Sequence, residues 1–324
     1  MRQRVLGKTQ IKVSEMGLGC WQLGADCGEV SEDTAFAIMK AAVDQGVTFF
    51  DTADVYGNGR SETLIGRFLK QASVHVRVAT KFGRTVYPDG YTELAMREGI
   101  DASLQRLGVD ALDLVQLHCI PMAVMQDGSV FDWLRQLKQD GKILNFGASV
   151  ESVDEAMVCM AHEDLATLQI IFNCFRQKPI QTLLPQAKAN NVGIIVRLPL
   201  ASGLLAGKMT LASTFAESDH RHYNRDGQCF NVGETFAGLR FEKGVEFADQ
   251  LKAWVPDGMT LAQMAMRWIL DHEAVSVLIP GASRPEQAMD NAKTSDLESL
   301  SRDLHRKLGD FYTQNVCDHI RGPY

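Results

Sequence analysis

Short runs of apolar and β-branched residues recur along the chain, and a stretch with helical spacing follows most of them. Residues 193–199, for example, read GIIVRLP, and residues 112–118 read LDLVQLH. Runs without polar alternation predict strands that are buried on both faces, as in a parallel sheet covered by helices. The predicted strands are residues 13–21, 48–54, 74–82, 112–118, 143–149, 168–173, 193–199 and 276–280.

The intervening stretches carry the signals of helix ends. Ser, Thr or Pro stands at the start of most predicted helices. The side-chain oxygen of Ser or Thr caps free N–H groups there, and the missing N–H of Pro leaves no hydrogen bond of the helix unmade. Gly46 and Gly108 follow two of the ends, as left-handed caps do. The predicted helices are residues 31–45, 61–70, 92–107, 129–139, 152–161, 179–190, 244–255 and 285–293, with additional helices at 261–271 and 296–313.

Eight strand–helix units predict an α/β protein with a closed (β/α)₈ TIM barrel, formed by one domain over residues 1–324. An open dinucleotide-binding sheet is disfavoured, because Gln22 occupies the last position of the G-x-G-x-x-G pattern that begins at Gly17. A long glycine-containing insertion, residues 200–240, interrupts the repeat after the seventh strand. Insertions of this length in compact enzymes are typically lids or cofactor clamps.

Composition narrows the class of protein. Apolar residues make up 45 % and charged residues 23 % of the 324 residues, which excludes a disordered chain and a coiled coil. Thirty-three Lys and Arg against 40 Asp and Glu give a net charge of −7, so we expect no binding to nucleic acid or membrane. The first residues do not resemble a secretory signal, and the seven cysteines are odd in number and scattered. Both features predict a cytoplasmic protein. His220 and His222 lack a third ligand, so no metal site is predicted.

Four polar residues stand at or just beyond the carboxyl ends of neighbouring predicted strands: Asp51, Tyr56, Lys81 and His118. In a barrel these ends meet at the active site. Each residue alone also fits a structural role, such as a buried Asp–Lys ion pair, a turn tyrosine or a core histidine. Their coincidence favours a site.

The chemistry of this group indicates a proton donor. A free phenol has a pKa near 10 and donates poorly at neutral pH. Lys81 should favour the phenolate of Tyr56, His118 should share the proton or orient the substrate, and Asp51 should keep Lys81 charged. Such a donor suits a carbonyl oxygen whose carbon receives a hydride, which implies a nicotinamide cofactor.

Three motifs resemble the aldo-keto reductase family. They are DTADVYGNGRSE at 51–62, LQRL at 104–107 with DLVQLH at 113–118, and IPGAS at 279–283, and the similarity runs from Leu6 to about Asn291. The resemblance implies a (β/α)₈ barrel that reduces aldehydes and ketones with NADPH. The family's catalytic tetrad then falls on Asp51, Tyr56, Lys81 and His118.

The resemblance also implies a nicotinamide subsite. Ser149 and Gln169 match positions that hold the carboxamide, with Asn173 in the same region, whereas Val150 replaces the family's asparagine. Arg197 stands where the family stacks an aromatic ring on the nicotinamide. A planar guanidinium can also stack on a ring.

Two segments match the family's phosphate sites. Residues 200–208 resemble a pyrophosphate loop. The helix after the eighth strand offers free N–H groups at its start, together with Arg284, to a 2′-phosphate. This favours NADP(H) as the cofactor over the alternative, NAD(H). Arg221 or Arg225 of the insertion would clamp phosphates, unless the insertion is a plain solvated loop. The implied contacts are Leu200, Ser202, Leu204, Lys208, Gly281, Ser283, Arg284, Gln287 and Asn291.

Trp21 and Tyr87 are the predicted substrate contacts, although Tyr87 also fits a surface position. The partner is a small carbonyl compound or alcohol, and the substrate, the direction of the reaction and the oligomeric state stay open. One alternative is a regulatory module, because the sequence also resembles the potassium-channel β-subunits of this family. Another is an aldolase in which Lys81 forms a Schiff base.

Overall fold

A computed structural model describes residues 1–24 and 30–324 of the chain. Eight parallel strands lie side by side in the order β10-β9-β8-β7-β6-β5-β4-β3, and parallel bridges from Met16 to Leu278 and from Gly19 to Gly281 bring the two edges together. The TIM barrel prediction is therefore confirmed. The barrel strands are β3 (Leu18–Gly19), β4 (Phe49–Asp51), β5 (Arg77–Phe82), β6 (Leu114–His118), β7 (Phe146–Ser149), β8 (Thr167–Ile171), β9 (Gly193–Arg197) and β10 (Val275–Leu278).

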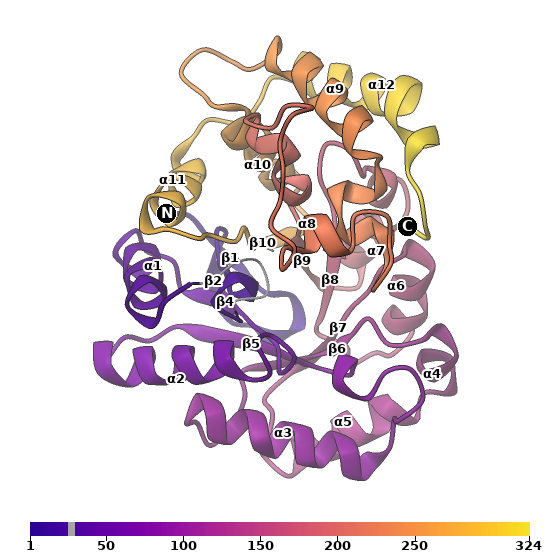
Figure 1. Cartoon of the computed structure of the whole chain (residues 1–324). Coiled ribbons are helices and arrows are strands. Elements are labelled where there is room, and N and C mark those ends of the chain that lie inside the picture. Colours follow the sequence, from indigo (N-terminus) through magenta and orange to yellow (C-terminus); the bar gives the residue numbers. More distant parts are fainter. Residues whose placement is uncertain (25–29) are drawn as a thin grey trace.

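The helices surround these strands (Figure 1). Several predicted caps are present: the Ser31 side chain accepts a hydrogen bond from the Thr34 N–H, and Ser152 forms a capping box with Glu155. The predicted helices correspond to α1 (Glu32–Asp44), α2 (Arg60–Ala72), α3 (Glu93–Leu107), α5 (Ser129–Gln139), α6 (Val153–Met160), α7 (Leu183–Ala189), α9 (Phe241–Lys252), α10 (Leu261–Leu270), α11 (Pro285–Ala292) and α12 (Arg302–Phe311).

Some element boundaries differ from the prediction. The last helix begins at Arg302 rather than at residue 296, because Leu297 has an extended backbone and Ser301 provides the N-cap. The sequence analysis also missed two short helices, α4 (Met122–Asp127) and α8 (His220–Tyr223). The second of these lies within the insertion. Cys27 lies outside the described residues, and the six described cysteines are free thiols.

The start of the barrel differs most from the prediction. Instead of one strand over residues 13–21, β1 (Gln3–Val5) and β2 (Lys12–Ser14) form an antiparallel hairpin, and only β3 joins the barrel. The hairpin turn lies against the first residue of β9, so close that a Cβ on Gly7 would lie 2.1 Å from the backbone nitrogen of Gly193. The hairpin therefore covers the amino-terminal end of the barrel.

Two apolar clusters form the core. The larger one lies between the strands and the helices, and the smaller one fills the inside of the barrel near the hairpin. The smaller cluster consists of Leu6, Val13, Phe49, Ala79, Leu114, Ile195, Val277 and Ile279. Further along the barrel strands the buried side chains become polar, with Asp51, Lys81, Gln116 and Gln169. This change of polarity places a buried polar layer at the carboxyl end of the barrel.

No helix in the described part of the chain has both the length and the apolar character that crossing a membrane requires.

The hairpin contact yields a stability prediction. Gly7→Ala should lower the free energy of unfolding by about 2–4 kcal/mol, because the methyl group meets backbone atoms of Gly193 and Ala166 that cannot move aside. Gly108→Ala is the matched control: Gly108 has a similar positive φ of 68°, but no atom lies within 4 Å of its Cβ position. It should cost only about 1 kcal/mol from backbone strain. Urea unfolding measures both, and equal losses would contradict the packing role of Gly7.

Candidate active site

The ends of β4, β5 and β6 bring Asp51, Lys81 and His118 together, and the loop after β4 adds Tyr56. Lys81 Nζ forms an ion pair with Asp51 Oδ1 and donates to the carbonyl oxygen of Thr52, 2.7 Å away, and to the Tyr56 hydroxyl, 3.3 Å away. The rings of Tyr56 and His118 are nearly perpendicular, with centroids 5.9 Å apart. All four predicted catalytic residues therefore share one site.

The second carboxylate oxygen of Asp51 is held by two amides. Gln169 Nε2 donates to Asp51 Oδ2 over 2.7 Å, and Gln116 Nε2 donates to the same oxygen over 3.1 Å. The sequence analysis missed Gln116, although its position two residues before His118 on a buried strand was a usable signal. Gln169, predicted to hold the nicotinamide carboxamide, here supports Asp51, and its Oε1 accepts a bond from Ser149 Oγ at 3.4 Å.

The pKa of Tyr56 reflects two opposing effects. Burial raises the pKa of the phenol, and this effect exceeds the lowering by Lys81. The sequence analysis considered the effect of Lys81 and did not include that of burial. The consequence is that Tyr56 remains protonated at neutral pH, and Lys81 supplies the positive charge that a tyrosinate would need once the proton has left.

His118 is neutral in this site. Burial holds the pKa of its imidazole well below 6.5, and the positive charges of Arg84, Lys81 and Arg197 lower it further. Its Nδ1 is buried and makes no hydrogen bond with any described residue. A neutral imidazole can orient a substrate oxygen through one hydrogen bond, but it does not supply a proton as an imidazolium would.

A cavity of about 500 Å³ opens above this group. Trp21 lines it, with its ring centroid 6.2 Å from that of Tyr56, 4.6 Å from that of His220 and 6.3 Å from that of Phe230. The insertion thus contributes an aromatic wall that the sequence analysis did not identify. The other predicted substrate residue, Tyr87, is 60 % exposed and does not line the cavity.

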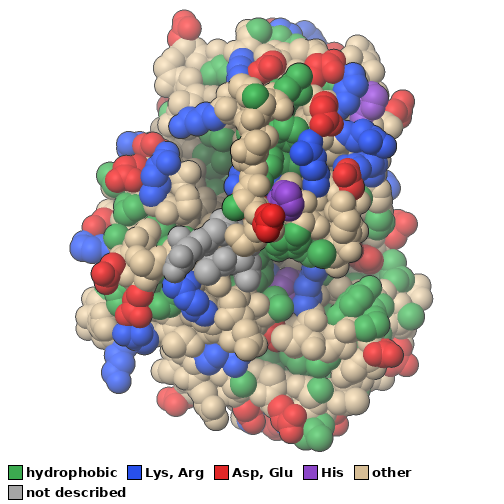
Figure 2. Space-filling view, viewed as in Figure 1, with side chains coloured by type: hydrophobic (Ala, Val, Ile, Leu, Met, Phe, Trp, Pro, Cys, Tyr) green, Lys and Arg blue, Asp and Glu red, His purple; other side chains and the backbone are tan. Residues whose placement is uncertain are grey.

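On the molecular face in Figure 2, acidic and basic side chains are interspersed.

The predicted cofactor residues divide into two groups. Gln169, Arg197, Leu200, Ser202, Gly281, Ser283 and Gln287 line the cavity. The other six do not line it. Ser149, Asn173 and Leu204 are buried elsewhere, and Lys208 is exposed. Arg284 forms an ion pair with Glu286 at 3.9 Å, and Asn291 donates a hydrogen bond to the carbonyl oxygen of Gly281. Arg221 also lines the cavity, whereas Arg225 pairs with Glu242 outside it.

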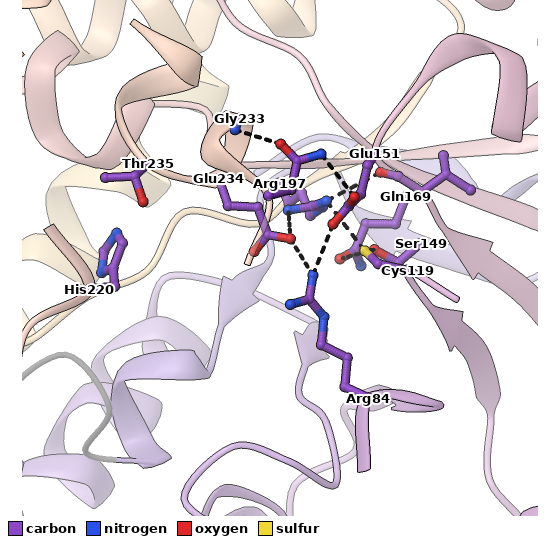
Figure 3. Close-up of polar contacts among 12 residues, drawn as sticks. Arg84, Cys119, Ser149, Glu151, Gln169, Arg197, His220, Gly233, Glu234 and Thr235 are labelled. Atoms are coloured by element: carbon purple, nitrogen blue, oxygen red, sulfur yellow. Dashed lines mark hydrogen bonds and ion pairs between the residues drawn. The ribbon is translucent and has the colours of Figure 1, made fainter. Parts of the chain in front are cut away.

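Two arginines and two glutamates gather beside the tetrad, and we call Arg84, Glu151, Arg197 and Glu234 the arginine–glutamate cluster (Figure 3). Arg84 Nη2 contacts Glu234 and lies 3.2 Å from Glu151 Oε1, and Arg197 Nη1 lies 3.5 Å from Glu234 Oε1. Arg197, expected to stack on a nicotinamide, is thus also ion-paired.

The sequence analysis missed the other three members of this cluster. The available signal was Arg197 itself, because an arginine on a buried strand needs a carboxylate partner.

The arginine–glutamate cluster also contains the carboxylates of a candidate metal-ligand group. Among the described residues, ligand atoms of Cys119, Glu151 and Glu234 lie within 4.8 Å of one another. Arg84 and Arg197 already balance the charge of these carboxylates. His220, considered as a metal ligand from the sequence, instead lies 3.5 Å from Ser202 Oγ.

Comparisons with known proteins show the family of the chain. The model of the aldo/keto reductase family matches residues 15–312. The chain is 31 % identical over 296 residues to the aldo-keto reductase YhdN of Bacillus subtilis, covering 89 % of this chain and 86 % of that one. It is 29 % identical to a probable voltage-gated potassium channel subunit beta of Arabidopsis thaliana, covering 93 % of each. Its fold is similar to a glycerol dehydrogenase of Gluconobacter oxydans, with a TM-score of 0.80, 28 % identity and coverage of 99 % and 97 %.

The low pKa of His118 yields a prediction on pH. The unfolded chain binds a proton on this histidine near pH 6.5, whereas the folded protein does not, so the free energy of unfolding falls as pH drops below 6.5, by up to ~1.4 kcal/mol per pH unit. His118→Asn should make this decline shallower. Denaturant unfolding between pH 5 and 8 measures it, and a His118 NMR titration with a midpoint near 6.5 would contradict the neutral assignment.

Proposed function

Because the chain belongs to the aldo/keto reductase family, we propose that it reduces an aldehyde or ketone to an alcohol with NADPH, reversibly, with Tyr56 as the proton donor. The observation that carries this proposal is the contact of Lys81 Nζ with both Asp51 and the Tyr56 hydroxyl at the base of the cavity. We propose further that residues 1–324 work as a single catalytic domain.

The cavity has features that fit a dinucleotide. It extends from Tyr56 and His118, past Gln22, to Ser283 and Gln287 at the start of α11. Gln22 Oε1 is buried without a hydrogen-bond partner among the described residues, so an added donor would satisfy it. The start of α11 offers backbone N–H groups to a phosphate, and Arg284 stands beside it, 57 % exposed in its side chain.

Individual residues would divide the cofactor between them. Gln169 and Arg197 would contact the nicotinamide end, Ser202 the pyrophosphate, and Ser283 with Arg284 the 2′-phosphate. Gln169 would then exchange or share its bond to Asp51, while Gln116 keeps its own bond to that carboxylate. When bound, the reduced nicotinamide supplies a hydride to the carbonyl carbon.

The chain's own residues complete the reaction by moving one proton. Tyr56 donates its hydroxyl proton to the carbonyl oxygen as the carbon receives the hydride, so the C=O group becomes H–C–O–H. Lys81 stabilises the tyrosinate left behind, and Asp51, which keeps its bond from Gln116, fixes Lys81 in its charged form. His118 orients the carbonyl oxygen toward Tyr56. Oxidation of an alcohol uses the same contacts in reverse.

The principal test removes only the hydroxyl of Tyr56. Tyr56→Phe should lower kcat by about 10²–10⁴-fold with a panel of small aldehydes, because the proton donor is lost while the ring remains. The variant should still bind NADPH with unchanged affinity, which fluorescence titration measures. Tight NADPH binding without turnover by either protein would instead support a regulatory module like the channel subunit. Borohydride trapping of substrate on Lys81 would support the aldolase.

A second variant tests the choice of cofactor. Arg284→Ala should raise the KM for NADPH by about tenfold, equivalent to about 1.4 kcal/mol, and leave the KM for NADH unchanged, since only NADPH carries the 2′-phosphate. Arg306→Ala on α12 is the matched control, because Arg306 is also exposed and ion-paired, with Asp303 at 3.0 Å. An equal effect of Arg284→Ala on both cofactors would remove Arg284 from the phosphate site.

A further inference from the structure

Arg84 occupies a place in the cavity that the proposed reaction does not use. It follows Lys81 by three residues, and Gly83, with a φ of 136°, turns the chain between them. Its side chain is 20 % exposed and lines the cavity together with Tyr56 and His118. Its guanidinium carbon lies 5.6 Å from the centre of the Phe230 ring, in the aromatic wall of the insertion. Arg84 is therefore a cation beside the reacting end of the cavity.

The ion pairs of Arg84 are made by one nitrogen of its guanidinium. Nη2 makes the contacts with both Glu151 and Glu234. Nε is buried without a hydrogen-bond partner among the described residues, Nη1 is not such a buried atom, and the guanidinium also contacts Cys119. A guanidinium binds carboxylates through charge-assisted hydrogen bonds, and the part of Arg84 that reaches the cavity can contact a ligand there.

The two neighbouring carboxylates lie in different surroundings. Burial and the adjacent Glu234 raise the pKa of Glu151, so it holds its proton more readily than a free glutamate. Burial works against the ionised form of Glu234 as well, but Arg84 and Arg197 hold its pKa below the usual value. Glu234 is the carboxylate that both guanidinium groups contact.

We propose that Arg84 is a specificity-determining residue and that the preferred substrates are carbonyl compounds with a carboxylate a few carbons from the carbonyl group. This inference rests on the proposed function. The carbonyl oxygen lies between Tyr56 and His118, the carboxylate contacts Arg84, and the short chain between them packs against Trp21 and Phe230. Arg84 acts on substrate choice and takes no part in the proton transfer.

The test compares a charged substrate with a neutral one of the same length. We would measure kcat/KM for 4-oxobutanoate and for butanal with NADPH, in wild type and in Arg84→Met. Wild type should prefer 4-oxobutanoate, and the preference should fall by roughly 10- to 100-fold in Arg84→Met, because the charge is lost while the length of the side chain is kept. The ratio of the two substrates separates this effect from general damage to the site by the loss of the Arg84–Glu234 contact, which would lower both rates together.

Arg225→Met is the control for the overall charge of the insertion. Arg225 pairs with Glu242 and lies over the Phe241 ring, and it does not line the cavity. Its substitution should leave the substrate ratio unchanged. An unchanged ratio in Arg84→Met, or an equal change in Arg225→Met, would overturn the proposal.

A binding measurement keeps the inference testable without turnover. Calorimetry would compare butanoate with butanamide, each added to wild type and Arg84→Met in the presence of NADP⁺. Wild type should bind butanoate at least tenfold tighter than butanamide, and Arg84→Met should lose this difference. Equal binding of the two ligands by wild type would overturn the assignment of Arg84. Absence of turnover with both aldehydes and with the whole panel of small aldehydes would instead contradict the proposed function.

Discussion

The buried ion pair between Lys81 and Asp51 is the interaction on which the site depends. Both side chains are almost completely removed from water, at 0 % and 3 % exposure. Charges in such a place are tolerated only when further hydrogen bonds satisfy them. The Thr52 carbonyl, the two glutamine amides and the Tyr56 hydroxyl meet this requirement. The same bonds fix the position of Tyr56 over the base of the cavity.

The position of the ion pair follows from the layering of the barrel. The amino-terminal half of the interior is apolar and is covered by the β1–β2 hairpin, so polar side chains are confined to the carboxyl ends of the strands. There the insertion approaches from the other side. Glu234 connects the insertion to β9 through Arg197 and to the loop after β5 through Arg84. The carboxylate of Glu234 thus connects the insertion, which covers the cavity, to two segments of the barrel.

Much of this organisation can be predicted from the sequence, because its signals are local. Apolar runs indicate the strands, and polar residues at the strand ends indicate the tetrad. The hairpin was missed because its two strands have only three residues each and its turn depends on Gly7 meeting Gly193, far away in the chain. The contact of Arg84 with Glu234 joins residues 150 positions apart, which no spacing rule reveals. The direction of the Tyr56 pKa shift depends on burial, which a sequence does not show.

The most direct test of this account is a single-turnover reaction with NADPH that carries deuterium at the transferred position, using wild type and Lys81→Met. Wild type should place the deuterium on the former carbonyl carbon of the alcohol. Lys81→Met should still bind the cofactor but transfer the deuterium about 10²–10⁴-fold more slowly, because the tyrosinate loses its supporting charge. An alcohol without deuterium would contradict hydride transfer from the cofactor. An equally fast Lys81→Met variant would contradict the central role of the Lys81–Tyr56 contact.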